Sequence, residues 1–247
     1  AELSNSSKQT WAIYLEDTFL FAIGFFALLL AKKTIILPHN IQPKTLEILS
    51  DAEILSEISY NKNAASKNLS LEISPNCEII FFTSGSTDLP KQVHKKFQHL
   101  ETEIEEISKI WHINSQLLVS SVTHQHIYGL LFRLLLPLSQ RILINSTITF
   151  APEELEKLAK DFTKITLVSS PAFLKRLTPE TVFSADFEHV FSSGGLLTKE
   201  IAENALSIFG TSPIEVLGRT ETGGVAWRIQ KNTDAWTRFP QVQIKLD

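Results

Sequence analysis

The chain has 247 residues, of which 43% are hydrophobic and 20% charged, so it can bury a sizeable core. Its formal net charge is −4, and this weakly acidic balance argues against nucleic acid or an anionic membrane as a partner. The single cysteine, Cys77, excludes an intramolecular disulfide and favours a reducing, cytoplasmic compartment. Because methionine is absent, we expect the sequence to begin inside a longer protein.

The most apolar stretch is Phe19–Ala31, whose 13 residues are too few to span a bilayer as a helix. Glu16 and Asp17 precede it, and Lys32 and Lys33 follow it. A secretory signal carries its basic residues on the other side, whereas this charge order suits the dipole of a helix. We therefore expect a buried core helix and no membrane span.

The first seventy residues predict an α/β layer. A strand, a helix and a second strand follow one another at a spacing that favours a right-handed parallel crossover. Pro43, a residue type favoured at the first helical position, predicts a helix over Lys44–Ile58, and the polar stretch Asn61–Ser70 predicts a loop. The first three elements are expected at 11–15, 18–31 and 34–37.

Strands and helices continue to alternate along the rest of the chain. Helical periodicity over Phe97–Ile110 places Leu100, Ile104 and Ile107 on one face. The further expected strands are 117–122, 141–150, 165–169, 189–191 and 213–216, and the further helices are 127–136, one from Pro152, a short one after Ser170-Pro171, and one from Thr198 to Phe209. This alternation predicts an α/β fold with layered, mostly parallel sheets and helices on both faces.

The stretch Glu78–Lys96 dominates the sequence. An apolar strand, Ile79–Phe82, leads into Thr83, Ser84, Gly85, Ser86 and Thr87, and Pro90-Lys91 follow. Hydroxyl groups, the amides of a glycine turn and a lysine charge together suit a polyphosphate. The spacing does not fit a Walker A loop, because Pro90 and Gln92 occupy its second glycine and hydroxyl positions. A Ser/Thr-rich surface turn with a solvated lysine is the alternative interpretation.

Glycine marks two more strand ends. Of the nine glycines, six lie in three strand-to-loop transitions: Gly85, Gly194, Gly195, Gly218, Gly223 and Gly224. Ligands of open α/β sheets bind beyond the carboxyl ends of the strands, and glycine lets the backbone approach a ligand closely. The three loops could therefore converge on one nucleotide.

The pattern T-S-G-S-T-x-x-P-K resembles the phosphate-binding loop of the adenylate-forming enzymes, a superfamily that includes acyl-CoA and aryl-CoA synthetases. Asp88 and Gln92 stand where that superfamily often has glycine. The loop Ser193-Gly194-Gly195 resembles its S-G-G segment, which lies along adenine and forms part of the acyl pocket. Ser-Ser-Gly-Gly is also common in ordinary loops.

The loop Leu217–Gly224 resembles the superfamily's Y-G-x-T-E motif. The resemblance implies that Gly218 and Thr220 contact the nucleotide, that Thr220 donates to the α-phosphate, and that Glu221 helps to hold Mg²⁺. Leu217 replaces the tyrosine that stacks on adenine. The alternative for Glu221 is a solvated loop acid.

His124-Gln125-His126 resembles the segment at the superfamily's acyl pocket, and His126 matches its gating position better than His124. An ordinary core or surface histidine is the alternative. The lack of a third ligand at recognisable spacing from these two histidines argues against zinc as a cofactor.

The resemblance implies ATP-dependent activation of a small carboxylic acid and transfer of the acyl group to a thiol. It assigns catalytic roles to Lys91, Thr220, Glu221 and His126, with ATP/AMP and Mg²⁺ as cofactors and coenzyme A or phosphopantetheine as acceptor. An acyl carrier protein is then a possible partner. The branch most similar to LVSSPAFLKRL and EVLGRTETGGVAWR comprises stand-alone AMP ligases of aryl polyene and fatty-acid-like pathways.

The same resemblance makes residues 1–247 an incomplete N-terminal AMP-binding domain, because neither a ribose-binding aspartate motif nor a C-terminal lid domain with its lysine is recognisable. One alternative is a degenerate ligase-like domain that binds a nucleotide, an acyl group or a protein without catalysis. Another is a different NTPase or kinase, against which the failed Walker spacing argues.

Overall fold

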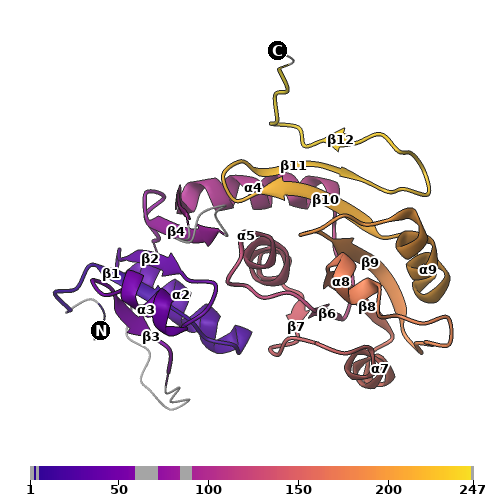
Figure 1. The fold of residues 1–247 in the computed structure, drawn as a ribbon, viewed down its shortest axis with the longest axis horizontal. Helices are drawn as coiled ribbons and strands as arrows, with labels where there is room; N and C mark the ends of the chain where they lie inside the picture. The colour runs from indigo at the N-terminus through magenta and orange to yellow at the C-terminus, as the bar shows by residue number, and fades with distance from the viewer. Residues whose placement is uncertain (1–2, 4–5, 59–71, 84–90, 246–247) are drawn as a thin grey trace. The chain divides into compact units, whose positions relative to one another are not determined.

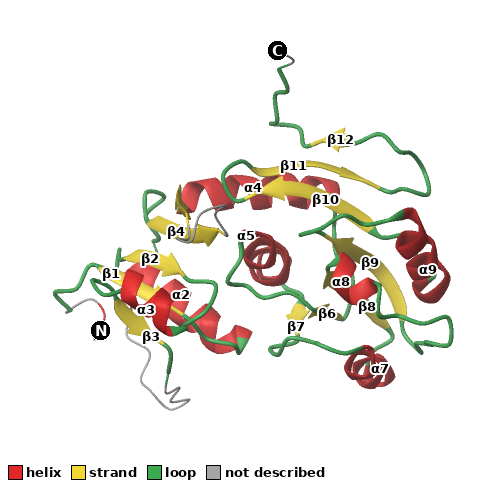
Figure 2. Ribbon diagram, in the orientation of Figure 1, coloured by secondary structure: helices red, strands yellow, loops and turns green. Residues whose placement is uncertain are grey.

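The computed structural model describes residue 3 and residues 6–58, 72–83 and 91–245. The chain divides into two compact units, residues 1–102 and 103–247. Figure 1 colours the chain by residue number and Figure 2 by secondary structure. Helix α4 (Phe97–Ile110) contributes residues to both units.

The first unit contains a five-stranded sheet with the order β3-β1-β2-β4-β5. The pairs β1–β3, β1–β2 and β2–β4 are parallel, whereas β5 runs antiparallel to β4. The elements are β1 (Thr10–Ile13), α2 (Thr18–Leu30), β2 (Thr34–Leu37), α3 (Pro43–Ile48), β3 (Glu53–Leu55), β4 (Glu78–Thr83) and β5 (Lys91–Lys96).

The predicted strand, helix and parallel strand at the start of the chain are confirmed. Helix α2 begins after Asp17, whose carboxylate accepts a hydrogen bond from the Leu20 amide at 2.9 Å. Phe21 and Phe25 on this helix are fully buried and stack with their ring centroids 5.7 Å apart. Strands β1 and β2 on either side of the helix are parallel neighbours. Among the described residues, no helix combines the length and apolarity needed to cross a membrane.

The predicted helix over Lys44–Ile58 is wrong in its second half. Helix α3 ends at Ile48, and the chain then forms β3, in which Ile54 pairs with Ala12 of β1. The edge of β1 offers unpaired backbone groups, and pairing with them outweighs a weak local preference for helix. The predicted loop at Asn61–Ser70 falls within 59–71, outside the described residues.

Strand β5 is a second correction, because no strand is predicted over the mostly polar and basic residues Lys91–Lys96. In the structure Lys91 pairs with Thr83, and Lys96 pairs with Glu78, along β4. Val93 and Lys95 are buried while their neighbours in the strand are exposed. This alternation has the period of a strand, but half of its buried positions are held by lysine, so a search for apolar residues misses it.

The second unit contains a seven-stranded sheet with the order β12-β11-β10-β9-β8-β6-β7. The run from β10 to β7 is parallel, and the β10–β11 and β11–β12 pairs are antiparallel. The predicted mostly parallel α/β fold is therefore confirmed. The elements that follow α4 are β6 (Leu117–Ser120), α5 (Ile127–Gly129), the π-helix η1 (Leu130–Leu135), α6 (Leu136–Gln140), β7 (Leu143–Ile144), α7 (Pro152–Asp161), β8 (Lys164–Ser169), α8 (Pro171–Leu174), β9 (Asp186–Ser192), α9 (Lys199–Phe209), β10 (Ile214–Arg219), β11 (Gly223–Arg228) and β12 (Thr237–Arg238).

Each face of this sheet has its own apolar core. Helices α7, α8 and α9 cover one face, where Leu167, Phe187 and Phe209 belong to one buried cluster. On the other face the buried ring of Trp111 lies 6.2 Å from Phe132 and 5.1 Å from Phe191, measured between ring centroids. Figure 1 shows α4 and α5 on this second face. Burial on both faces explains why the central strands are almost continuously apolar.

Three predictions in this unit need correction. The expected strand over Arg141–Phe150 shrinks to β7, because Arg141 adopts a left-handed conformation and only Leu143 and Ile144 pair with β6. The expected loop Leu217–Gly224 forms the end of β10, a short turn and the start of β11. The short strand β12, at Thr237–Arg238, was not predicted and is the third correction.

Candidate functional site

The carboxyl ends of the parallel strands bring several hydroxyl groups together in the second unit. Ser121, after β6, and Ser169, at the end of β8, lie with their Oγ atoms 2.9 Å apart. Ser169 pairs with Ser192 at the end of β9, and Ser193 Oγ donates to the Val216 carbonyl of β10 at 2.8 Å. Two of the three predicted loops are thus adjacent.

The loop Ser193–Gly195 presents open backbone. Gly194 has a φ of 83°, and nothing lies within 4 Å of the position that a Cβ atom would take there. At Gly195 the nearest atom to such a position is Pro171 Cγ, at 3.7 Å. A flat ligand can therefore approach this backbone closely, which fits the adenine role that the resemblance implies.

A β-hairpin carries the Thr220-Glu221 pair. Leu217 and Gly218 lie near the end of β10, Gly223 begins β11, and Thr220 and Glu221 belong to the connecting turn. A Cβ atom at Gly218 would lie 2.7 Å from the Gly223 carbonyl oxygen, so the tip of the hairpin depends on glycine. Glu221 is exposed, as is 44% of Leu217.

A buried carboxylate that the sequence analysis missed supports the base of this hairpin. Glu215, only 4% exposed, accepts hydrogen bonds from Arg228 Nε at 2.7 Å and from Gln230 Nε2 at 3.0 Å. It also accepts one from the Leu197 amide at 3.4 Å, which connects the glycine loop to the hairpin. The signal in the sequence is a lone acid inside an apolar strand, since such an acid needs partners to be buried.

The two histidines of the His124-Gln125-His126 segment have different environments. His124 is fully buried, whereas His126 is exposed and occupies the residue position just before α5. Gly129 is required here, because a Cβ atom at that position would lie 1.9 Å from the Thr123 carbonyl oxygen. Burial raises the pKa of the neighbouring Tyr128, so its phenol stays neutral.

Thr83 and Lys91 belong to the first unit and flank the predicted phosphate loop. They pair at the end of the β4–β5 ladder, and Thr83 Oγ1 donates to the Lys91 carbonyl at 3.4 Å. Lys91 is exposed. Ser84, Gly85, Ser86, Thr87 and Asp88 fall within 84–90 and lie outside the described residues.

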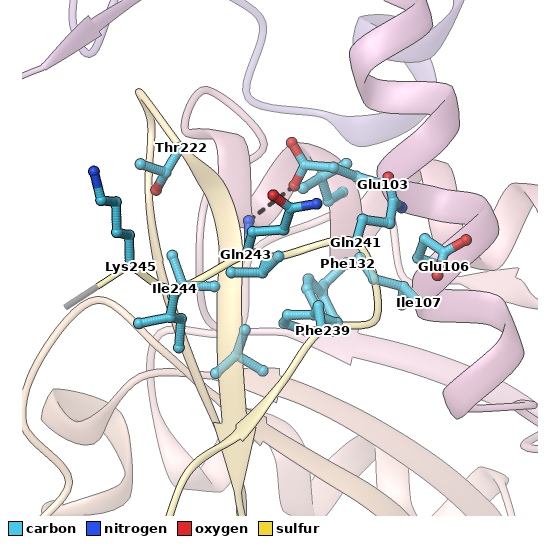
Figure 3. A pocket seen from close by; sticks show the side chains of 15 residues that line it. Glu103, Glu106, Ile107, Phe132, Thr222, Phe239, Gln241, Gln243, Ile244 and Lys245 are labelled. Carbon is cyan, nitrogen blue, oxygen red and sulfur yellow. Dashed lines mark hydrogen bonds between the residues drawn. The ribbon is translucent and has the colours of Figure 1, made fainter.

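A cavity of about 660 Å³ lies beside the hairpin in the second unit (Figure 3). Thr222 and Gly224 of the hairpin and Glu103 of α4 line it. Figure 3 shows Thr222 and Glu103 towards one end and the rings of Phe132 and Phe239 towards the other. The cavity thus has a polar end at the hairpin and an apolar end, an arrangement typical of small-molecule sites.

Among the residues that the structure describes, no group of three or more His, Cys, Asp or Glu side chains could hold a metal ion. Mg²⁺ needs less, because it keeps several waters and commonly binds one or two carboxylates together with substrate phosphates. The exposed carboxylate of Glu221 fits that kind of site.

The fold is that of an α/β protein with glycine-lined strand ends, where proteins of this class bind their ligands. The chain belongs to the AMP-binding enzyme family, whose model matches residues 32–245, and this confirms the resemblance to adenylate-forming enzymes. No curated protein matches the sequence significantly.

Several solved structures have a similar fold. A malonyl-CoA ligase with methylmalonyl-CoA and AMP bound shares 17% identity at a TM-score of 0.68, over 92% of this chain and 55% of that one. ATP-bound MatB from Rhodopseudomonas palustris shares 15% identity at 0.67, over 92% and 53% of the two chains. A variant of E. coli MenE with bound OSB-AMS shares 20% identity at 0.68, over 92% and 54%. These likenesses show the fold, and this chain spans about half the length of each of those proteins.

Proposed function

We propose that this chain is the nucleotide-binding part of an enzyme that activates a carboxylic acid with ATP and passes the acyl group to a thiol. One observation carries the proposal most directly. The hairpin that holds Thr220 and Glu221 also contributes Thr222 and Gly224 to the wall of the cavity. A nucleotide phosphate at the turn and an acid in the cavity would then be neighbours.

In the first step, an oxygen of the acid attacks the α-phosphorus of ATP, and the bond from that phosphorus to pyrophosphate breaks. A carboxylate is a weak nucleophile, so catalysis depends on positioning and charge neutralisation. Thr220 would donate to the α-phosphate, and Lys91 with the Thr83–Thr87 segment would hold the outer phosphates. Mg²⁺ held by Glu221 would offset the charge of pyrophosphate. In the second step, a thiolate attacks the acyl carbon and AMP leaves.

The adenine would lie along Ser193, Gly194 and Gly195. Leu217, exposed at the end of β10, would pack against the base with its aliphatic side chain. Gly218 would allow the backbone to approach. These assignments fit the open backbone at Gly194 and the hydrogen bond that connects Ser193 to Val216.

The acid would place its carboxylate at the hairpin and its hydrocarbon part towards Phe132 and Phe239. The cavity volume of about 660 Å³ suits an aryl or medium-length acyl group. His126, exposed at the start of α5, would act as a gate to the acyl site. The acceptor would be coenzyme A or the phosphopantetheine of an acyl carrier protein.

The domain assignment follows from the same proposal. Residues 1–247 would form an N-terminal AMP-binding domain that works with a C-terminal lid domain. A place among the stand-alone AMP ligases of aryl polyene or fatty-acid-like pathways would agree with the apolar end of the cavity. The proposed location is the cytoplasm, which the single cysteine favours.

ATP–pyrophosphate exchange over a panel of aryl and fatty acids tests the proposal, with the full-length gene product and the 247-residue chain assayed in parallel. Exchange that depends on one class of acid supports it and identifies the substrate class. ATP binding without exchange by either protein would instead favour a degenerate domain. Acid-independent release of ADP would indicate an NTPase.

A further inference from the structure

One side chain of helix α4, Glu103, forms a hydrogen bond with the hairpin. The carboxylate of Glu103 accepts a hydrogen bond from the Gly224 amide, with Oε2 and N 3.0 Å apart, and Figure 3 shows this bond. The two residues are 121 positions apart in the sequence. A bond from an amide to a charged acceptor is stronger than one between neutral groups.

The backbone of the hairpin is shaped to meet this carboxylate. Gly223 has a φ of 74°, and a Cβ atom there would lie 2.3 Å from Glu103 Oε1. A side chain at this position would therefore displace the carboxylate, and it would also be strained. The position of the Glu103 carboxylate therefore requires glycine at position 223.

The hairpin needs an anchor outside its own ladder. The register of β10 and β11 shifts between Leu217 and Gly218, so regular pairing is interrupted just before the turn. Gly224, which faces Gly218 across this irregularity, donates its amide to Glu103. Residues 220–222 are thus held at one side by an element far away in the sequence.

From this geometry we propose that Glu103 is a positioning residue, which fixes the turn 220–222 so that Thr220 and Glu221 meet the phosphate and the metal. This inference rests on the proposed function for what the turn does. Glu103 acts through the hairpin, and the chemical step uses Thr220 and Glu221. Glu103 thus lines the cavity proposed for the carboxylic acid and also positions the turn proposed to bind the nucleotide.

Two substitutions of similar volume isolate the hydrogen bond from the cavity wall. Glu103→Gln keeps an oxygen acceptor, whereas Glu103→Leu fills the same space without one. We expect Glu103→Gln to stay within about threefold of the parent enzyme in pyrophosphate exchange, and Glu103→Leu to lose about tenfold to a hundredfold with a raised Mg²⁺ requirement. Glu105→Gln, an exposed acid on the same helix, is the control and leaves activity unchanged.

Amide NMR of the 247-residue chain provides a readout that needs no activity. In Glu103→Leu the Gly224 amide should exchange faster with solvent, and the signals of Thr220 and Glu221 should move. Equal activity of the Leu and Gln variants, or unchanged Thr220 and Glu221 signals in the Leu variant, would overturn the role of Glu103. If the parent enzyme itself shows no exchange reaction, the proposed function fails, and the NMR result still decides whether Glu103 positions the turn.

Discussion

Replacing Glu188 with glutamine should weaken the fold in a pH-dependent way. Glu188, on β9, accepts hydrogen bonds from Lys164 Nζ at 2.9 Å, Ser115 Oγ at 2.7 Å and the Asn114 amide at 2.8 Å. Burial alone would raise the pKa of this carboxyl, but the bonds from Lys164, Ser115 and Asn114 outweigh it and lower the pKa from 4.5 to about 2. The ionised form therefore ties the segment before β6 to the sheet.

The pKa shift sets the size of the effect. A change from 4.5 to about 2 corresponds to roughly 3 kcal/mol as an upper limit. Because 42% of the Lys164 side chain is exposed, solvent screening reduces our expectation to about 1.5 kcal/mol. A lowered pKa stabilises the fold above pH 4.5, and this contribution is lost as the pH falls through 4.5 towards 2.

Urea unfolding of the parent chain and of Glu188→Gln, followed by circular dichroism at pH 7 and pH 3, measures the prediction. The difference in unfolding free energy should be about 1.5 kcal/mol at pH 7 and less than half of that at pH 3. Burial, the largest influence, lowers the pKa of the adjacent His189, whose own titration also contributes to the pH dependence of stability. The comparison is therefore repeated in a His189→Asn background, which removes that titration. A difference that stays constant between the two pH values would refute the reasoning.

Three further outcomes follow from the site. Lys91→Ala should raise the KM for ATP in pyrophosphate exchange about tenfold or more, because a phosphate contact is lost. Lys96→Ala is the control, and an unchanged KM in Lys91→Ala would contradict the assignment. Glu221→Gln should raise the Mg²⁺ concentration for half-maximal exchange, and an unchanged Mg²⁺ titration would exclude its role as a ligand. Gly129→Ala should destabilise the fold by about 2 kcal/mol or more in urea unfolding, because its Cβ atom would overlap the Thr123 carbonyl; wild-type stability would show that α5 can move away.

Local signals predicted the elements that carry them. The helix from Thr198 to Phe209 was predictable because Thr198 caps its first turn and Gly210 ends it in a left-handed conformation, as the structure confirms. The crossover around α2 was predictable for a similar reason, since the two short β-branched strands flank one continuous apolar helix. In these segments, local preference and tertiary packing favour the same structure.

The predictions failed where hydrogen bonds to residues far away in the sequence determine the conformation. Gly218 and Gly223 indicate a loop when taken alone, yet the antiparallel partner strand makes them the end of a hairpin. Strand β5 forms because the edge of β4 accepts it, although its sequence is mostly polar. Glu103 and Glu215 show no local signal of their partners, since hydrogen bonds to Gly224 and Arg228 depend on the assembled fold.

The aromatic cluster around Trp111 gives the second unit an intrinsic spectroscopic probe. The indole lies 6.2 Å from Phe132 and 6.0 Å from Phe239, between ring centroids, and both phenylalanines line the cavity. Indole emission shifts with the polarity of its surroundings, so an acid that displaces water from the cavity should change the fluorescence of Trp111. A Trp111→Phe variant identifies its share of the signal, and ligand entry can then be timed in a stopped-flow instrument without any label.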